Sequence, residues 1–282
     1  MRFVTPVLHY NRIYLTGWLQ LIATVLCVGT VAPHHSGPAG GGFALLRTRK
    51  SYAFHDFREV APAAATENQF VNRTGSPSLY SGEAVGVPGE IAGLETLHKL
   101  YGSLPWEGLF KPAIKLAKEG FEVSTELGEV IADPTYEFVF TKPGWKEDYA
   151  PGGKRVKTGD VMTRKVYATT LQKLAKGGAK EFYHGDIGKD IVRTVQENGG
   201  IITAADLAAY KVVKRKTFSV KYKGFTITSG EAPSSGVAVL LALKIYEGFK
   251  AAPKVLSLHR LIEATKFAFG AVSTPRPLPV CH

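Results

Sequence analysis

One arginine of this 282-residue sequence stands where it could hold a carboxylate. Arg58 follows a strand-like run that ends at Phe57, and acidic residues flank it at Asp56 and Glu59. A guanidinium can grip a carboxylate through two parallel charge-assisted hydrogen bonds, so an arginine at a strand end is a sound anchor for an amino-acid carboxylate. The spacing alone favours the simpler alternative, which is an ordinary surface ion pair.

Two adjacent histidines, His34 and His35, are candidates for a metal site. In a strand their side chains would point in opposite directions, so one ion could not easily use both. We therefore expect structural or hydrogen-bonding histidines rather than metal ligands. The two cysteines, Cys27 and Cys281, form neither a disulfide framework nor a zinc cluster. The sequence accordingly predicts no metal and no cofactor.

The paired hydroxyl residues lack the surroundings of a nucleophile. Ser234 and Ser235 have no glycine two residues ahead of them, so we interpret them as the N-cap of the next helix. Thr169 and Thr170 lie inside a predicted helix, where no free α-amine can serve as their base. The glycines at 40–42 lack the lysine and the spacing of a phosphate loop and predict a tight structural turn.

Composition favours a folded protein with many turns. Hydrophobic residues make up 45% and charged residues 21%, and the 30 glycines and 16 prolines suit a mixed α/β protein with short connections. The formal net charge is +11, but the densest basic runs, 47–50 and 211–216, carry no interleaved aromatic residues. A surface that stacks bases needs such residues, so we expect no nucleic-acid partner.

Hydrophobic periodicity predicts short strands and amphipathic helices. The predicted strands are 43–47, 51–57, 218–222 and 225–228, and the predicted helices are 19–28, 91–101, 109–117, 163–176, 187–197, 203–210, 237–246 and 258–269. Helix 237–246 is apolar nearly all round, which predicts a place deep in a core. We expect residues 141–160 to form a long exposed segment. Helix 19–28 could instead belong to a signal or anchor segment, because arginines precede it.

A polar stretch at 68–81 predicts a loop. It contains Asn72-Arg73-Thr74, which makes Asn72 a possible glycosylation acceptor if the protein is secreted.

Several stretches, taken together, resemble the large-subunit region of γ-glutamyltransferases. They are 32–43, 56–62, 84–93, 102–106, 112–114, 119–121, 199–207, 232–236 and 259–264. All appear in the family's order, so we divide the chain into a non-matching segment 1–20, a partial large-subunit-like domain 21–269 and a non-matching tail 270–282. The match at 21–33 favours a core helix over an anchor, and the tail suggests a truncated or shifted reading frame.

The resemblance implies a mixed α/β (α+β) fold, namely an incomplete αββα sandwich of the N-terminal-nucleophile hydrolase type. Family members cut themselves into two subunits, and the N-terminal threonine of the small subunit attacks the γ-glutamyl amide of glutathione. The acyl group then passes to water or to an acceptor amino acid or peptide. In the family, the arginine at the Arg58 position grips the α-carboxylate of the glutamyl group. The expected partners are therefore γ-glutamyl compounds and a small catalytic subunit.

The chain departs from the family pattern in two respects. No threonine here stands in the context of the family's cleavage site, so we expect no catalytic residue and an inactive chain when it is alone. Pro38-Ala39 stand in the glycine loop where the family usually has an apolar residue and a glycine, which predicts an altered loop. Two alternatives stay open: a non-catalytic binding or assembly fragment, and a half sandwich whose uncovered faces favour aggregation. Compartment also stays open, because family members are commonly secreted, plasma-membrane-anchored or vacuolar.

Overall fold

The computed structural model describes residues 13–48 and 51–273, and these form two compact units. Within the described part, one unit comprises 13–42 and 57–212, and the other comprises 43–56 and 213–273. Several features noted in the sequence lie outside the described residues. They are Cys281, the end of the first basic run (49–50) and most of the two predicted terminal segments (1–12 and 274–282).

The first unit is mainly helical. Its longer helices are α1 (Ile13–Val31), α3 (Glu90–Tyr101), α4 (Trp106–Glu119), α7 (Lys165–His184) and α8 (Asp186–Glu197). Its shorter elements are α2 (Pro77–Tyr80), α5 (Thr125–Ala132), α6 (Lys146–Tyr149), α9 (Ala204–Ala209) and the 3₁₀ turns η1 (Gly82–Ala84), η2 (Pro134–Phe140) and η3 (Pro151–Gly153). Strands β3 (Phe121–Glu122) and β4 (Val161–Met162) pair antiparallel.

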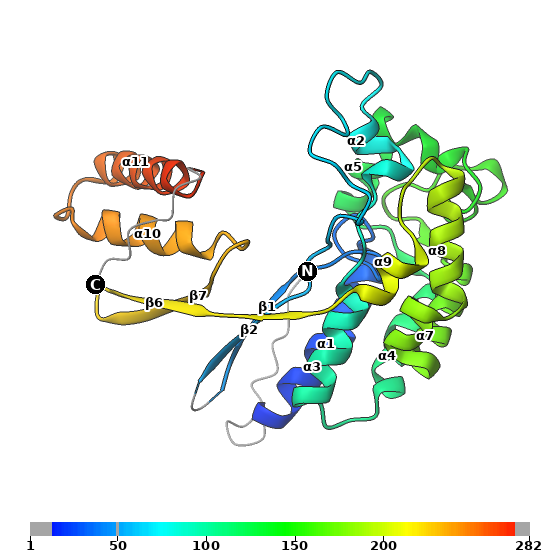
Figure 1. The fold of residues 1–282 in the computed structure, drawn as a ribbon, viewed down its shortest axis with the longest axis horizontal. Helices are drawn as coiled ribbons and strands as arrows, with labels where there is room; N and C mark the ends of the chain where they lie inside the picture. The colour runs from blue at the N-terminus through cyan, green and yellow to red at the C-terminus, as the bar shows by residue number, and fades with distance from the viewer. Residues whose placement is uncertain (1–12, 49–50, 274–282) are drawn as a thin grey trace. The chain divides into compact units, whose positions relative to one another are not determined.

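The core of this unit lies where α1, α3, α4 and α7 pack against one another (Figure 1). Ile22 and Leu26 of α1 are fully buried there with Phe110 of α4. This confirms a core helix in the first part of the chain. The helix runs through Gly29 to Val31, however, and the absence of a side chain at Gly29 lets Gly37 of the following loop lie 3.3 Å from the β-carbon position. Among the described residues, no helix has the length and apolar character needed to cross a membrane.

Two predictions for this unit differ in outcome. The predicted helix 163–176 is interrupted at the glycine pair that follows it, because Gly178 has a non-helical φ of 61° and ψ of −156°, and a second helical segment of α7 then continues to His184. The prediction that residues 141–160 form an exposed segment is wrong in part. Tyr149 and Val156 are buried there in a second apolar cluster with Val123 and Leu127.

The second unit contains most of the strands. Antiparallel β1 (Phe43–Arg47), β2 (Tyr52–Asp56) and β5 (Val213–Arg215) form a sheet in the order β1-β2-β5. Strands β6 (Thr217–Tyr222) and β7 (Phe225–Gly230) form the predicted hairpin, and both residues of its turn have positive φ, 47° at Lys223 and 84° at Gly224. Helix α10 (Gly236–Glu247) packs on the hairpin, and α11 (Lys254–Val272) packs on α10 (Figure 1).

The helices of the second unit leave much of their apolar surface uncovered. The apolar residues whose period predicts the last helix form an exposed stripe, with Leu258 at 55%, Ile262 at 49% and Phe269 at 55%. Val239 of α10 is 55% exposed as well, so the prediction that this helix lies deep in a core is wrong for the described chain. Exposed apolar surfaces of this kind mark protein or membrane interaction sites, ligand-binding grooves or aggregation liabilities.

Candidate functional site

Arg58 lies on a backbone segment that is held from several sides. The amide of Phe57 donates to the carbonyl of Gly42 at 2.9 Å, and the amide of Gly42 donates to the carbonyl of Phe57 at 3.1 Å. The hydroxyl of Tyr210 donates to the carbonyl of Arg58 at 2.8 Å. The Arg58 side chain is nevertheless 56% exposed. The fold therefore fixes the backbone while the guanidinium stays accessible to a ligand.

The glycine loop supports this segment through close backbone contact. A β-carbon on Gly41 would lie 2.5 Å from the carbonyl oxygen of Phe57 and 2.8 Å from the amide nitrogen of Glu59. No residue with a side chain fits there without a shift of the backbone. The described glycines at 37 and 40–42 all have ordinary φ values, so close approach and not a left-handed backbone requires glycine here. The predicted tight turn packed under other chain is confirmed.

The loop also begins helix α3. The carbonyl of Gly40 accepts hydrogen bonds from the amides of Gly89 and Glu90, at 2.8 and 2.9 Å. These amides belong to the first turn of the helix, whose donors have no partner within the helix itself. A β-carbon on Gly89 would meet the carbonyl of Phe57 at 2.0 Å. The glycine loop therefore packs against both the Arg58 segment and the start of α3.

Glu59 forms an ion pair with the Arg58 side chain. Its Oε2 lies 3.2 Å from Nη1 of Arg58. The ion-pair alternative is therefore present, but an exposed pair of this kind contributes only about 0–1 kcal/mol. A ligand carboxylate with better geometry can compete for the guanidinium. Asp56, the other predicted flanking acid, is buried in the second unit and accepts a hydrogen bond from Nε of Arg215 at 2.5 Å.

Glu90 places a titratable carboxyl under the glycine loop. It is buried, and the hydroxyl of Ser36 donates to its Oε2 at 3.2 Å. The pKa of Glu90 is raised to about 7, chiefly by burial and to a smaller extent by the nearby Glu59 carboxylate. The Ser36 hydrogen bond acts in the opposite direction and only offsets part of the rise. This carboxyl therefore changes charge near neutral pH, beside the segment that carries Arg58.

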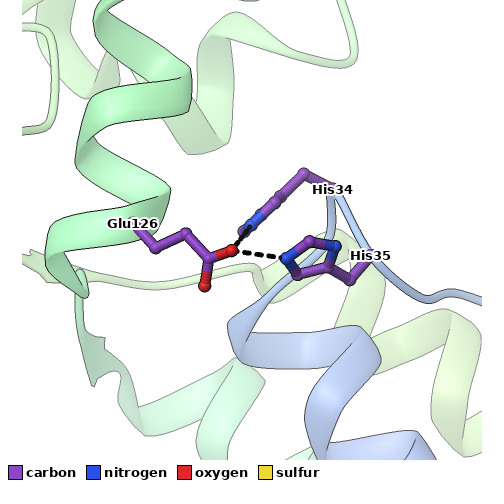
Figure 2. Close-up of side chains that lie close together, drawn as sticks. All are labelled: His34, His35 and Glu126. Carbon is purple, nitrogen blue, oxygen red and sulfur yellow. Dashed lines mark hydrogen bonds and ion pairs between the residues drawn. The ribbon is translucent and has the colours of Figure 1, made fainter. Parts of the chain in front are cut away.

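The two histidines do not lie on a strand, so the expectation based on strand geometry is wrong. They occupy the turn after α1, where the amide of His35 donates to the carbonyl of Ala32 at 3.0 Å. Both rings face the carboxylate of Glu126 on helix α5 (Figure 2). No sequence pattern singles out Glu126, because it lies 91 residues from His35 and no local motif links the two.

The paired hydroxyl residues have structural surroundings. Ser235 occupies the N-cap position of α10 without a side-chain capping bond, whereas the hydroxyl of Ser234 accepts from the amide of Gly236 at 3.4 Å and donates to two carbonyls. Ser235 is therefore the N-cap residue by position, as predicted, and the hydroxyl that contacts the start of the helix is that of Ser234. Thr169 and Thr170 donate to carbonyls four residues earlier in α7, each at 3.3 Å.

Asn72 is exposed in a turn and has a φ of 57°. Its side chain is accessible, and its use as a glycosylation acceptor stays a prediction.

Comparison of this chain with known proteins shows the family to which it belongs. The model of the family described as gamma-glutamyltranspeptidase matches residues 21–274. Glutathione hydrolase proenzyme of Arthroderma benhamiae is 45% identical over 246 residues, which cover 85% of this chain and 42% of that protein. Glutathione hydrolase of Aspergillus flavus is 42% identical over 259 residues, covering 89% of this chain and 43% of that protein. The crystal structure of Helicobacter pylori gamma-glutamyltranspeptidase has a TM-score of 0.86 at 31% identity, covering 91% of this chain and 76% of that chain.

The fold is thus of the N-terminal-nucleophile hydrolase type, as the resemblance implied. This chain belongs to the gamma-glutamyltranspeptidase family. It spans less than half the length of the two fungal relatives, 42% and 43%.

Proposed function

We propose that this chain supplies the glutamate-binding half of a γ-glutamyl-transferring hydrolase that acts on glutathione and related γ-glutamyl compounds. The observation that carries the proposal is Arg58, whose backbone is fixed by Gly42 and Tyr210 while its guanidinium stays accessible. A planar guanidinium holds a carboxylate by two parallel hydrogen bonds, and this sets the direction of the rest of the substrate. The family resemblance assigns the α-carboxylate of the glutamyl group to this arginine.

This half contributes to the reaction by positioning the glutamyl group of the substrate. Holding the α-carboxylate at one end of the glutamyl group fixes the γ-carbonyl at the other end, where the nucleophile attacks. Correct placement of reacting groups contributes a large share of the rate in acyl transfer. By the family resemblance, the N-terminal threonine of the small subunit attacks this carbonyl, its own α-amine acts as the base, and the amine of the leaving group departs.

We propose that the nucleophile-bearing small subunit covers the exposed stripe of α11. The stripe comprises Leu258, Ile262 and Phe269, which are each about half exposed on one helix of the second unit. The β6–β7 hairpin of the same unit has no further strand paired to it within the described residues. An uncovered apolar helix face and open strand edges are what a shared sandwich presents before its other half joins.

A γ-glutamyl anilide assay tests this function. The 282-residue polypeptide is purified alone and also after co-expression with the nucleophile-bearing portion of one of the fungal relatives. We expect no aniline above a buffer blank from the polypeptide alone and release of aniline from the pair, and Arg58→Ala removes that release. Turnover by the polypeptide alone would show that the nucleophile lies within these residues and would contradict the proposed division of labour.

The exposed α11 stripe also favours a second candidate, a non-catalytic assembly fragment. In that case the chain copurifies with the small-subunit portion, but the pair releases no aniline. Replacing Leu258 and Ile262 by serine should abolish copurification in either case, whereas Arg58→Ala should leave copurification intact. The two candidates therefore differ in turnover and not in assembly.

A further inference from the structure

His34, His35 and Glu126 bring three potential metal ligands together (Figure 2). Nε2 of His35 lies 2.7 Å from Oε1 of Glu126, and Nε2 of His34 lies 3.8 Å from the same oxygen. One ligand atom of each residue lies within 4.8 Å of the other two. Ligand bonds of about 2.0–2.1 Å to a tetrahedral zinc ion set neighbouring ligand atoms about 3.3 Å apart. Small rotations of the exposed His35 and Glu126 side chains would bring the three atoms to that spacing.

His34 supplies an independent observation that points to a ligand. Both ring nitrogens are buried and have no hydrogen bond within the described part of the chain. The closest approach to Nε2 is the 3.8 Å contact with Glu126. A buried polar group without a hydrogen bond costs about 1–3 kcal/mol, so native structures rarely keep one without a reason. A metal ion between His34 and Glu126 would satisfy Nε2.

Both elements that carry these ligands are held in place locally. The turn after α1 is closed by hydrogen bonds from the amides of His35 and Ser36 to the carbonyl of Ala32, at 3.0 and 3.4 Å. Helix α5 begins at a capped residue, since the hydroxyl of Ser124 accepts from the amide of Leu127 at 3.1 Å. Glu126 is therefore in the first turn of a helix with a defined start. Ligands on preformed elements lose little freedom when they bind an ion.

The two histidines of the cluster line a pocket of about 450 Å³, which is large enough to admit water beside them. His34, His35, Tyr149, Arg164 and Tyr167 are among its lining residues. Arg164 is the nearby cation, and it is already engaged with Asp148 at 3.4 Å and with the carbonyl of Gly29 at 3.0 Å. Its charge is therefore largely compensated before a metal ion enters.

We propose that His34, His35 and Glu126 bind a divalent transition-metal ion of the zinc type, with a water molecule as the fourth ligand. Two imidazoles and one carboxylate form a ligand set that zinc favours, whereas magnesium and calcium prefer oxygen ligands alone. The ion links the turn ahead of the glycine loop to helix α5. It thereby fixes the segment on which the Arg58 region rests, without taking part in the γ-glutamyl chemistry.

Calorimetric titration of the 282-residue chain with zinc chloride tests this site without any need for activity. The protein is made without a polyhistidine tag and carries Cys281→Ser in every variant, which removes a competing thiol. The test variants are His35→Ala and Glu126→Gln, whose side chains are both more than half exposed, so the fold does not depend on them. The matched controls are Glu129→Gln on the same helix and His184→Ala, both at exposed positions.

We expect one zinc ion per chain, a dissociation constant at least about tenfold weaker in His35→Ala and Glu126→Gln, and no change in the controls. Magnesium chloride should give no heat of binding. A chain that binds no zinc below about 100 μM would overturn the proposal, since three-ligand sites bind far more tightly than that. The same holds if zinc binds with equal strength to the two test variants, because the ion then lies elsewhere.

Discussion

The hydroxyl of Tyr210 donates a 2.8 Å hydrogen bond to the backbone carbonyl of Arg58, across 152 residues of sequence. The same ring stacks on Tyr183, with ring centroids 5.7 Å apart and planes inclined by 8°. Tyr183 in turn donates to the carbonyl of Pro88, at 2.8 Å, just ahead of α3. These contacts join the end of α9 to the segment that presents the proposed carboxylate anchor, and they make the position of Arg58 testable through residues that never touch a ligand.

Tyr210→Phe should weaken ligand binding although Tyr210 does not reach the ligand. The substitution keeps the ring stack and removes one hydrogen bond, which contributes about 1 kcal/mol to stability. We expect a fall of that size in the free energy of unfolding and a several-fold rise in the dissociation constant for a γ-glutamyl ligand. Tyr80→Phe, at an exposed position of α2, is the control and should change neither quantity.

Gly41→Ala should disturb the site far more than Gly37→Ala in the same loop. A β-carbon on Gly41 would lie 2.5 Å from the carbonyl of Phe57, whereas one on Gly37 would meet nothing within 4 Å. Overpacking of this kind costs roughly 1–3 kcal/mol. Urea unfolding followed by circular dichroism measures both variants. If Gly41→Ala and Gly37→Ala were equally stable, the glycine loop would not be in tight contact with the Arg58 segment.

Glu90 should make stability fall as pH rises towards neutrality. Burial raises its pKa from 4.5 to about 7, so between these values the folded chain keeps a proton that the unfolded chain has released. The free energy of unfolding therefore decreases over this range and levels off above about pH 7. The full effect is on the order of 3 kcal/mol.

Glu90→Gln tests this pH dependence, because glutamine stays neutral and keeps the size of the side chain. We expect the variant to lose most of the slope between pH 5 and 7 and to be more stable than the parent at pH 8. Glu107→Gln, an exposed acid in the first turn of α4, should keep the slope of the parent. A slope unchanged by Glu90→Gln would place the titrating group elsewhere.

Arg215→Ala should destabilise the second unit by roughly 2 kcal/mol. The Asp56 side chain is 7% exposed and pairs with Arg215 at 2.5 Å, so loss of the arginine removes an ion-pair partner from a nearly buried carboxylate. The expected cost lies between those of exposed and fully buried pairs, because Arg215 is itself 31% exposed. Adding Asp56→Asn to Arg215→Ala should recover part of the loss, and thermal melting of the three variants measures it. If the double variant were no more stable than Arg215→Ala, the buried charge would not be the cause.

The elements with strong local signals could be predicted from the sequence. Helix α9 starts at a capping box, in which Thr203 and Asp206 each bond the other's backbone, and the hairpin turn at Lys223-Gly224 has the residues its geometry requires. Features decided by distant packing could not be predicted. Glu126, for example, meets the two histidines only through the tertiary fold.

Arg58 shows the same difference between features set by local sequence and features set by distant packing. Its position after a strand could be read from the sequence, but its support by Gly42 and Tyr210 could not. The uncovered stripe on α11 is a further case. Periodicity identified Leu258, Ile262 and Phe269 as one face of a helix, and periodicity carries no information on which polypeptide covers that face.

In the proposed function, Arg58 holds the α-carboxylate of a γ-glutamyl ligand. Calorimetric titration of the chain with glutathione, and with the analogue whose α-carboxylate is an amide, measures it directly. We expect saturable binding of glutathione by the parent chain. The dissociation constant should be at least about tenfold larger for Arg58→Ala, and larger by the same factor when the parent chain binds the amide analogue. Arg73→Ala, another arginine paired with a glutamate on the surface, should bind as the parent does. No saturable binding by the parent, or binding that survives both Arg58→Ala and the amide, would contradict it.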